Sequence, residues 1–343
     1  MDLLPSPDQL ELTGAAAAFC AQVDPTQLIR RRRHESTALP AENWSAAAEL
    51  GLLGLSAPLS VGGLDMRLAD EALVFRELGR ALMPGPFLPT VLAARVATLG
   101  GDAELAAQFV SGEVLCGLAI VSEARLSPDR ISGRVHLVDA VGADYAVVAD
   151  PAGAGLLPTA PSDTFDWSPV NCLDLGSRLA VGDVDGAELR CFVPAERDPI
   201  WLRGLVLAAA MQVGIAEACR DLSVEHAKNR IQFGRPIGVN QAVKHRCADM
   251  AVAAEAALQQ MVYAALSLQE GNSDAELHAL AARIVAAKAA LSNASEALQV
   301  HGGMGFTFEH DVHLYLKRAH ILDHLFGSRA THLDELLVLG AAS

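Results

Sequence analysis

The spacing of hydrophobic and polar positions changes twice along the chain. Over residues 9–109, apolar residues recur at intervals of three and four, as on one face of an α-helix, with breaks at Pro and Gly. Over residues 114–200, short β-branched runs such as 145–148 and 179–184 alternate with Gly, Pro and Asp turn signals. From residue 201 onward, long Ala-rich amphipathic segments return. This pattern predicts helices, then a small β domain, then a helical bundle.

The last segment is expected to hold three long helices and one final helix near the end of the chain. The long helices are predicted at residues 201–229, 241–269 and 274–301. The expected fold class is therefore α+β, with three domains. These are an N-terminal α-helical domain at residues 1–113, a middle β-barrel-like domain at 114–200 and a C-terminal four-helix bundle at 201–343.

Charge and hydropathy narrow the classes of partner. The 343 residues carry a formal net charge of -15, whereas a broad nucleic-acid or anionic-membrane surface would need a positive footprint. Asp2, Asp8 and Glu11 interrupt the N-terminus where a signal peptide would need a basic patch and an apolar run. The longest apolar runs fall short of the ~20 residues that cross a bilayer. We therefore expect a cytoplasmic protein that binds neither nucleic acid nor membrane.

Common metal and nucleotide motifs do not occur in the sequence. The six cysteines show no CxxC or other metal-ligand spacing, so free thiols are expected. His310 and His313 stand in no HExxH frame, and no metal is expected as a cofactor. Neither a Walker loop nor a GxGxxG after a strand is present. A nucleotide cofactor would therefore have to bind in another way.

Three stretches carry a resemblance to a known family. The first reads WSAAAELGLLGLSAPLSVGG at residues 44–63, followed by FRELGRAL at 75–82. The second reads RIQFGRPIGVNQAVKHRCADM at residues 230–250, and the third reads QVHGGMGFTFEHDVHLYLKRA at 299–319. Together they resemble the acyl-CoA dehydrogenase family, whose members have an N-terminal helical domain, a middle β domain and a C-terminal four-helix bundle. The segments described above follow the same order.

The resemblance implies FAD as the cofactor and names the residues that would hold its ADP half across a subunit interface. A guanidinium can pair with two pyrophosphate oxygens, a phenyl ring offers an apolar face, and an amide can hydrogen-bond the adenosine. Glycines allow backbone amides to approach a phosphate closely. The residues at the matching positions are Arg230, Phe233, Gln241, Gln299, Gly302 and Gly303.

The catalytic carboxylate of the family has no counterpart at either of its two known positions. The reaction needs a base that removes the acidic α-proton while hydride leaves the β-carbon for the flavin. Gly327 stands at the usual position, in HLFGSRAT, and Gly204 stands at the alternative position. Arg203 and Leu205, one residue to either side, are no better. The nearest substitutes in sequence are Asp323 and His324.

The middle domain also departs from the family pattern. Where members carry a T-E-P-x-x-G-S-D-like loop and a W-I-T-N-like strand, only Glu123 and the GADYAVV run that begins at Gly142 keep the same character. The residues expected to hold the flavin ring and the acyl thioester have therefore diverged. Those expected to hold the ADP half are intact.

This asymmetry resembles the heterotetrameric bacterial acyl-CoA dehydrogenases of steroid side-chain degradation, in which a short subunit without the base pairs with a complete one. We expect the chain to act with a second subunit on an acyl-CoA substrate, giving the 2-enoyl-CoA. Two alternatives remain open. One is a self-sufficient homomeric dehydrogenase with Asp323 or His324 as an unconventional base. The other is a flavin-free structural or regulatory scaffold of the same fold.

Overall fold

The chain forms two compact units, each built from segments that are separated in the sequence. The computed structural model describes residues 4–121, 125–160 and 166–342. The bundle unit comprises Met1–Thr26, Ala72–Met83 and Leu205–Ser343. The sheet unit comprises Gln27–Glu71 and Pro84–Gly204. The three domain boundaries expected from the sequence stay a prediction.

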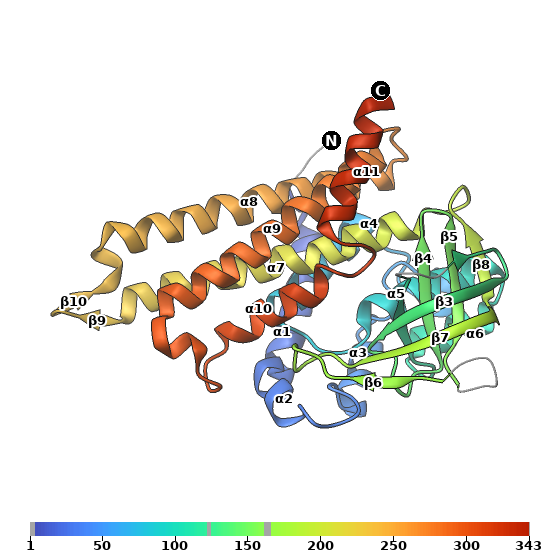
Figure 1. Cartoon of the computed structure of the whole chain (residues 1–343), viewed down its shortest axis with the longest axis horizontal. Coiled ribbons are helices and arrows are strands. Elements are labelled where there is room, and N and C mark those ends of the chain that lie inside the picture. Colours follow the sequence, from blue (N-terminus) through green and yellow to red (C-terminus); the bar gives the residue numbers. More distant parts are fainter. Residues whose placement is uncertain (1–3, 122–124, 161–165, 343) are drawn as a thin grey trace. The chain divides into compact units, whose positions relative to one another are not determined.

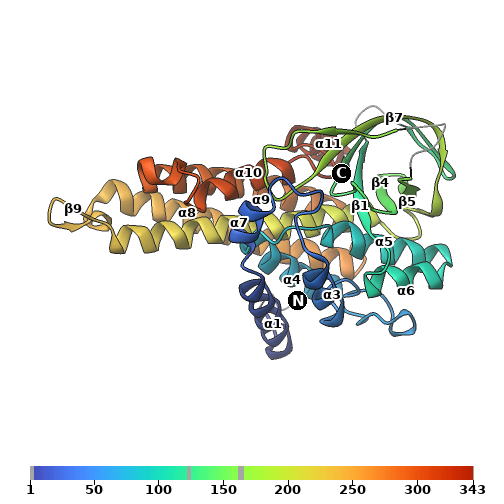
Figure 2. The same ribbon diagram turned by 90° about the horizontal axis from the view of Figure 1, so that it is seen from below.

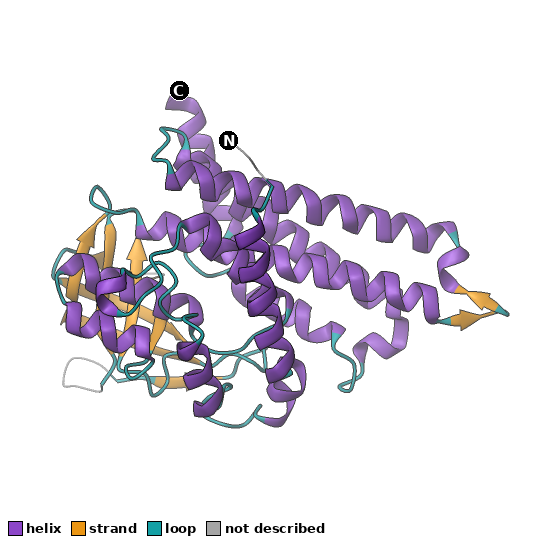
Figure 3. Cartoon of the chain, turned by 180° about the vertical axis from the view of Figure 1, so that it is seen from behind, coloured by secondary structure: helices purple, strands orange, loops and turns teal. Residues whose placement is uncertain are grey.

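The sheet unit combines short helices with a mixed β-sheet. Its helices are α2 (Pro25–Arg31), α3 (Ala41–Glu49), η1 (Leu59–Val61), α5 (Phe87–Gly100) and α6 (Ala103–Ser111). Its strands are β1 (Cys116–Val121), β2 (Arg125–Leu126), β3 (Arg130–Val138), β4 (Tyr145–Asp150), β5 (Gly153–Pro158), β6 (Ser168–Val170), β7 (Leu179–Glu188) and β8 (Arg190–Pro194). The β texture predicted for residues 114–200 is confirmed. Figure 3 shows these strands gathered in one sheet.

The sheet follows the strand order β6-β7-β3-β1-β4-β5-β8, and β2 pairs with β3. The β1 and β4 strands run parallel, with Leu118 opposite Val147, whereas the other pairs in the sheet are antiparallel. Side chains alternate along β3, so that Ile131 and Val135 are buried while Arg130 is exposed. Helix α5 packs against β1, β4, β5 and β8. The sheet therefore has a covered core of small and β-branched residues.

The bundle unit is built from helices. They are α1 (Pro7–Val23), most of α4 (Leu68–Arg80), α7 (Ile200–Asn229), α8 (Gln241–Gln269), α9 (Ala275–His301), α10 (Val312–Leu322) and α11 (Arg329–Ala342). Helices α7, α8 and α9 run side by side (Figure 1). Short elements join α7 to α8 and α9 to α10: β9 (Ile231–Gln232), β10 (Arg235–Pro236), η2 (Ile237–Val239) and η3 (Gly302–Phe306). The three long helices predicted for the last segment are confirmed.

One prediction for this region is corrected, because the chain ends in two helices where the spacing indicated one. After α10, Phe326 and Gly327 adopt positive φ angles of 61° and 115°, which no helix can contain. Helix α11 then begins behind Ser328, whose Oγ accepts a hydrogen bond from the Thr331 amide at 3.2 Å. The break is a local turn that the apolar spacing does not reveal.

Within the part of the chain that the structure describes, two helices are long and apolar enough, by length and composition alone, to cross a membrane. They are α7 and α8, with mean hydropathies of 1.4 and 1.2 over their most apolar windows. In α7, 94% of that window is buried inside the protein, and α8 packs along α9 in the same bundle. Helix α7 therefore owes its apolar character to its place in the core.

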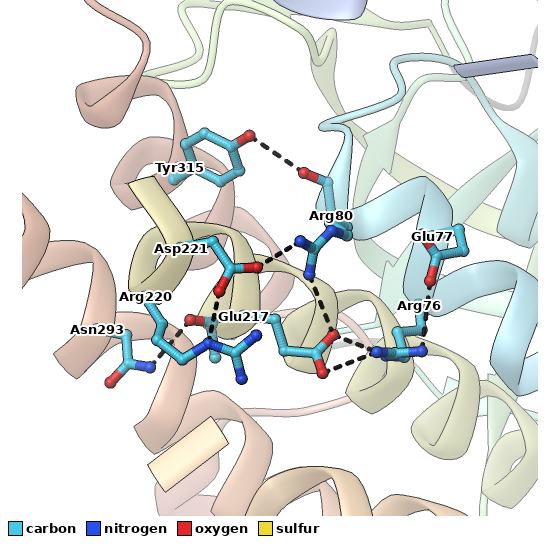
Figure 4. A network of polar contacts seen from close by, with 9 residues as sticks. Arg76, Glu77, Arg80, Glu217, Arg220, Asp221, Asn293 and Tyr315 are labelled. Carbon is cyan, nitrogen blue, oxygen red and sulfur yellow. Dashed lines mark hydrogen bonds and ion pairs between the residues drawn. The ribbon is translucent and has the colours of Figure 1, made fainter. Parts of the chain in front are cut away.

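Helices α4 and α7 cross at very short range because glycine stands at the contact on both sides. A Cβ atom at Gly214 would overlap the Arg76 carbonyl, and one at Gly79 would overlap the Met211 backbone. Beside the crossing, the Arg76 guanidinium contacts both carboxylate oxygens of Glu217, at 2.7 and 2.8 Å (Figure 4). Such a bidentate pair fixes the orientation of the two helices as well as their separation.

The close crossing predicts that Gly214→Ala destabilises the protein. The added methyl group would meet backbone atoms, which cannot move away cheaply, so we expect a loss of about 2–3 kcal/mol in the free energy of unfolding. Urea unfolding followed by circular dichroism measures the loss. The matched control is Gly14→Ala in α1, where nothing lies within 4 Å of the new methyl group. That change should be neutral or stabilising, by up to about 1 kcal/mol. Equal stabilities of the two variants would contradict a close backbone contact at the crossing.

Candidate functional site

The second sequence stretch begins with a hairpin that lies between the end of α7 and the start of α8, and Figure 2 shows it beyond the helices. Strands β9 and β10 are joined by Phe233 and Gly234, with φ angles of 51° and 77°. Positive φ at both central residues is the requirement of a type I′ turn, which favours Asn and Gly. A phenylalanine there is strained, and its side chain is fully exposed. Strain and exposure together make Phe233 a candidate functional residue.

The other residues expected to hold FAD also lie on the surface of this end of the bundle. Arg230, directly after α7, is exposed, and its backbone amide donates to the His226 carbonyl at 2.8 Å. Gln241, the first residue of α8, and Gln299, near the end of α9, are exposed. A Cβ atom at either Gly302 or Gly303 would meet nothing within 4 Å, so the backbone there borders open space.

We call this end of the bundle the tip, and it consists of Arg230 to Gln241 together with Gln299 to Gly303. Contacts among three histidine rings connect these two parts of the tip. The rings of His226 and His301 are 4.2 Å apart between centroids, and those of His301 and His310 are 4.6 Å apart. His226 lies one helical turn before Arg230, and His301 lies two residues after Gln299. The structure therefore brings the separate sequence stretches together. Sequence reasoning considered His310 only as a possible metal ligand and missed His226 and His301, although their positions relative to the motifs were visible.

The rings of His226 and His301 lie in an environment that disfavours positive charge. Burial, with the proximity of His226 and His310, lowers the pKa of His301 to about 4. Burial also lowers the pKa of His226, and the nearby His310 and Arg230 act in the same direction. The Nδ1 atom of His301 lies 2.7 Å from the Ala297 carbonyl, so that nitrogen carries the proton of the neutral ring.

The turn between α10 and α11 contains the expected base position, and no carboxylate occupies it. Gly327 has a φ of 115°, and a Cβ atom built there would lie 2.7 Å from Cε1 of His332. His332 is fully buried, and its Nδ1 lies 3.1 Å from a carboxylate oxygen of Glu335. Burial lowers the pKa of His332, and the positive charge of the nearby Arg283 acts in the same direction. The hydrogen bond to Glu335 raises the pKa but does not outweigh these two effects.

The substitutes expected from the sequence lie near this turn but differ in environment. Asp323 is half-buried, its Oδ1 is buried with no hydrogen-bond partner, and its charge acts on the buried Arg283. His324 is exposed. At the alternative base position, Gly204 follows Arg203, whose buried guanidinium forms an ion pair with Glu71 within the sheet unit. An arginine there cannot accept a proton.

In the middle of the chain, Glu123 lies outside the described residues. The run from Gly142 enters β4, where Ala146, Val147 and Val148 are buried in the sheet. This part of the resemblance therefore forms sheet core. Among the described residues, no group of three His, Cys, Asp or Glu side chains is placed to hold a metal ion.

Comparisons with known proteins decide the family. Residues 6–112 match the model "Acyl-CoA dehydrogenase, N-terminal domain", and residues 203–337 match "Acyl-CoA dehydrogenase, C-terminal domain". Acyl-CoA dehydrogenase IpdE2 of Mycobacterium tuberculosis is 37% identical over 274 residues, which cover 79% of this chain and 78% of the relative. The chain belongs to the acyl-CoA dehydrogenase family.

Solved structures agree with this assignment. The ChsE4-ChsE5 complex from Mycobacterium tuberculosis matches with a TM-score of 0.88 at 24% identity, and covers 100% of both chains. The Tcur3481-Tcur3483 steroid ACAD matches with a TM-score of 0.86 at 25% identity, covering 98% of this chain and 99% of that one. The α+β acyl-CoA dehydrogenase fold expected from the sequence is confirmed.

As an acyl-CoA dehydrogenase, the chain is an oxidoreductase acting on a CH–CH bond, with FAD as cofactor. The tip fits one half of this cofactor. An exposed guanidinium, an exposed phenyl ring, two exposed amides and open space over two glycines are the groups that a pyrophosphate and an adenosine require.

The histidines predict an acid-sensitive stability. Unfolded His301 takes up a proton below about pH 6.5, whereas the folded chain does so only near pH 4. The unfolded state therefore binds more protons between these values, and stability falls as the pH drops from about 6.5 to 4. His301→Gln should remove up to about 3 kcal/mol of this loss, measured by urea unfolding across that pH range. His320→Gln, an exposed control on α10, should keep the wild-type pH dependence. If the free energy of unfolding depends on pH in the same way in His301→Gln and in the wild type, His301 is not the source of the acid sensitivity.

Proposed function

We propose that this chain is the base-lacking subunit of a hetero-oligomeric acyl-CoA dehydrogenase, and that its tip holds the ADP half of the FAD bound by a partner subunit. The observation that carries the proposal is the outward exposure of Arg230, Phe233 and Gln241. Side chains that serve the chain's own core would be buried, whereas these face away from it. They are therefore available to a ligand held by another chain.

The condition of the base positions supports the same proposal. Removal of an α-proton needs a carboxylate within hydrogen-bond distance of that proton. Gly327 has no side chain, and Gly204 is preceded by an arginine that is already paired. The chain can thus bind and orient the cofactor without carrying out the proton transfer itself. The partner subunit supplies the base and the contacts to the flavin ring.

The reaction of the complex is the α,β-dehydrogenation of an acyl-CoA thioester. When bound, FAD would supply the acceptor for the hydride that leaves the β-carbon, and a carboxylate of the partner would take the α-proton, so that the product is the 2-enoyl-CoA. In this chain, Arg230 neutralises the pyrophosphate charge, and Phe233 covers an apolar face of the cofactor. We propose a steroid-derived acyl group as the substrate class, because one of the similar solved structures is described as a steroid ACAD.

A homomeric enzyme is the second candidate. Asp323 lies four residues before Gly327, and one of its carboxylate oxygens is buried with no hydrogen-bond partner. Purification of the chain alone, and then with a co-expressed partner of the same family, separates the two candidates. The proposal expects a colourless lone chain and a yellow heterotetramer with about two FAD per four subunits. A yellow, active homomer that loses its activity on Asp323→Asn would refute it.

The role of the tip predicts a specific loss of cofactor. Arg230→Ala removes charge-assisted hydrogen bonds to the pyrophosphate, so the affinity of the complex for FAD should fall by about 10- to 100-fold. Flavin released by dilution and quantified by fluorescence measures this change. Arg329→Ala, which removes the same charge from an exposed position on α11 outside the tip, is the control and should retain FAD. Unchanged FAD content in Arg230→Ala would instead support a flavin-free scaffold.

A further inference from the structure

The place that a side chain at residue 327 would occupy is already filled. A Cβ atom at Gly327 would lie 2.7 Å from Cε1 and 3.2 Å from Nε2 of His332, and real Cβ atoms essentially never come within 3.0 Å of another heavy atom. The backbone adds a second obstacle, since a φ of 115° is rarely adopted by any residue except glycine. A larger residue at 327 would therefore have to displace the ring and also strain the turn.

The imidazole ring of His332 is held from several directions. Its Nδ1 lies 3.1 Å from Glu335 Oε2, one turn further along α11, and it interacts with the backbone carbonyl of Gly327. The charged groups that act on it are Glu335 and Arg283, and Arg283 approaches from α9. The ring has no exposed surface. A side chain so enclosed cannot swing aside without losing these contacts or leaving buried groups unpaired.

The geometry points to His332 as a plug that closes this chain's own copy of the base position. The inference rests on the proposed function, because only the resemblance makes residue 327 the base position. It goes further, since a position that lacks a carboxylate could still be open to an acyl chain, whereas a plugged one is not. Gly327→Glu alone is therefore expected not to restore a base.

A mutant cycle on the purified chain, with its partner where the partner is required, tests whether the ring fills this space. Gly327→Ala is made in four backgrounds: wild type, His332→Ala, His332→Val and His332→Gln. Alanine and valine lack the ring atoms that the new methyl group would meet, whereas glutamine keeps a long side chain. The loss in melting temperature caused by Gly327→Ala in the wild type should shrink in the alanine and valine backgrounds and persist in the glutamine background.

The matched control is Gly271→Ala, at the turn between α8 and α9. Gly271 also has a positive φ, of 68°, but nothing lies within 4 Å of its Cβ position. The loss in melting temperature caused by Gly271→Ala therefore reports backbone strain alone, and it should be the same in all four backgrounds. Equal losses for Gly327→Ala in all four backgrounds would overturn the plug. The valine background keeps the test decisive if His332→Ala does not fold.

Thiol labelling tests closure directly. The thiol introduced by Gly327→Cys should react slowly with a maleimide, and severalfold faster once His332 is replaced by valine, as followed by peptide mass spectrometry. The thiol introduced by Gly271→Cys should react at one rate in both backgrounds. If the thiol at position 327 reacts as fast as the one at position 271 while His332 is in place, the position is open and the inference is refuted. Neither melting temperature nor thiol reactivity requires FAD or turnover. The inference about His332 can therefore be refuted while the proposed function is upheld, and the proposed function can be refuted while the inference is upheld.

Discussion

The bundle depends on the guanidinium of Arg283, which is the most deeply buried charged group among the described residues of the bundle unit. It lies on α9 with 1% exposure, and it donates hydrogen bonds to the Gln212 side chain of α7 and to the backbone carbonyls of Leu322 and Leu325. Burial lowers its pKa to about 10, against the opposing charge of Asp323, so the group stays protonated at neutral pH. A buried charge is tolerated only when it is well hydrogen-bonded. The carbonyls that end α10 must therefore stay where Arg283 holds them, and this fixes the turn that contains Gly327.

The same helix separates the two parts of the site. Gln299 of the tip and Arg283 beside the vacant turn are 16 residues apart on α9, which corresponds to about 24 Å along the helix axis. Asn293, between them, donates to the Ala216 carbonyl of α7 at 3.0 Å and to the Met250 carbonyl of α8 at 2.9 Å. The bundle is thus tied together between two ends that lie far apart. Because of this separation, the proposed role of the tip in binding FAD does not depend on which residue stands in the turn.

The sequence was sufficient for features that depend on local spacing, and insufficient for those that depend on contact between distant residues. Periodicity located α7, α8 and α9 closely, and the string from Arg230 to Gln241 identified the tip. The break before α11 was missed because a single glycine and a cap at Ser328 look like ordinary surface positions. His332 was also missed. It stands five residues from Gly327 on a new helix, and only the folded turn shows that its ring fills the space beside that glycine.

The energetic cost of Phe233 in the isolated chain supports the proposal that the tip is half of a shared site. A positive φ costs a bulky residue of the order of 1–2 kcal/mol, and leaving a phenyl ring in water forgoes about 1.5–3 kcal/mol that burial would contribute. Nothing in the described part of the bundle unit offsets these costs, because the ring is fully exposed. An asparagine would form the same turn without them. The residue is therefore unfavourable for the chain alone and becomes favourable only when its ring is covered by a cofactor or a neighbouring subunit, which is the situation that a shared FAD site creates.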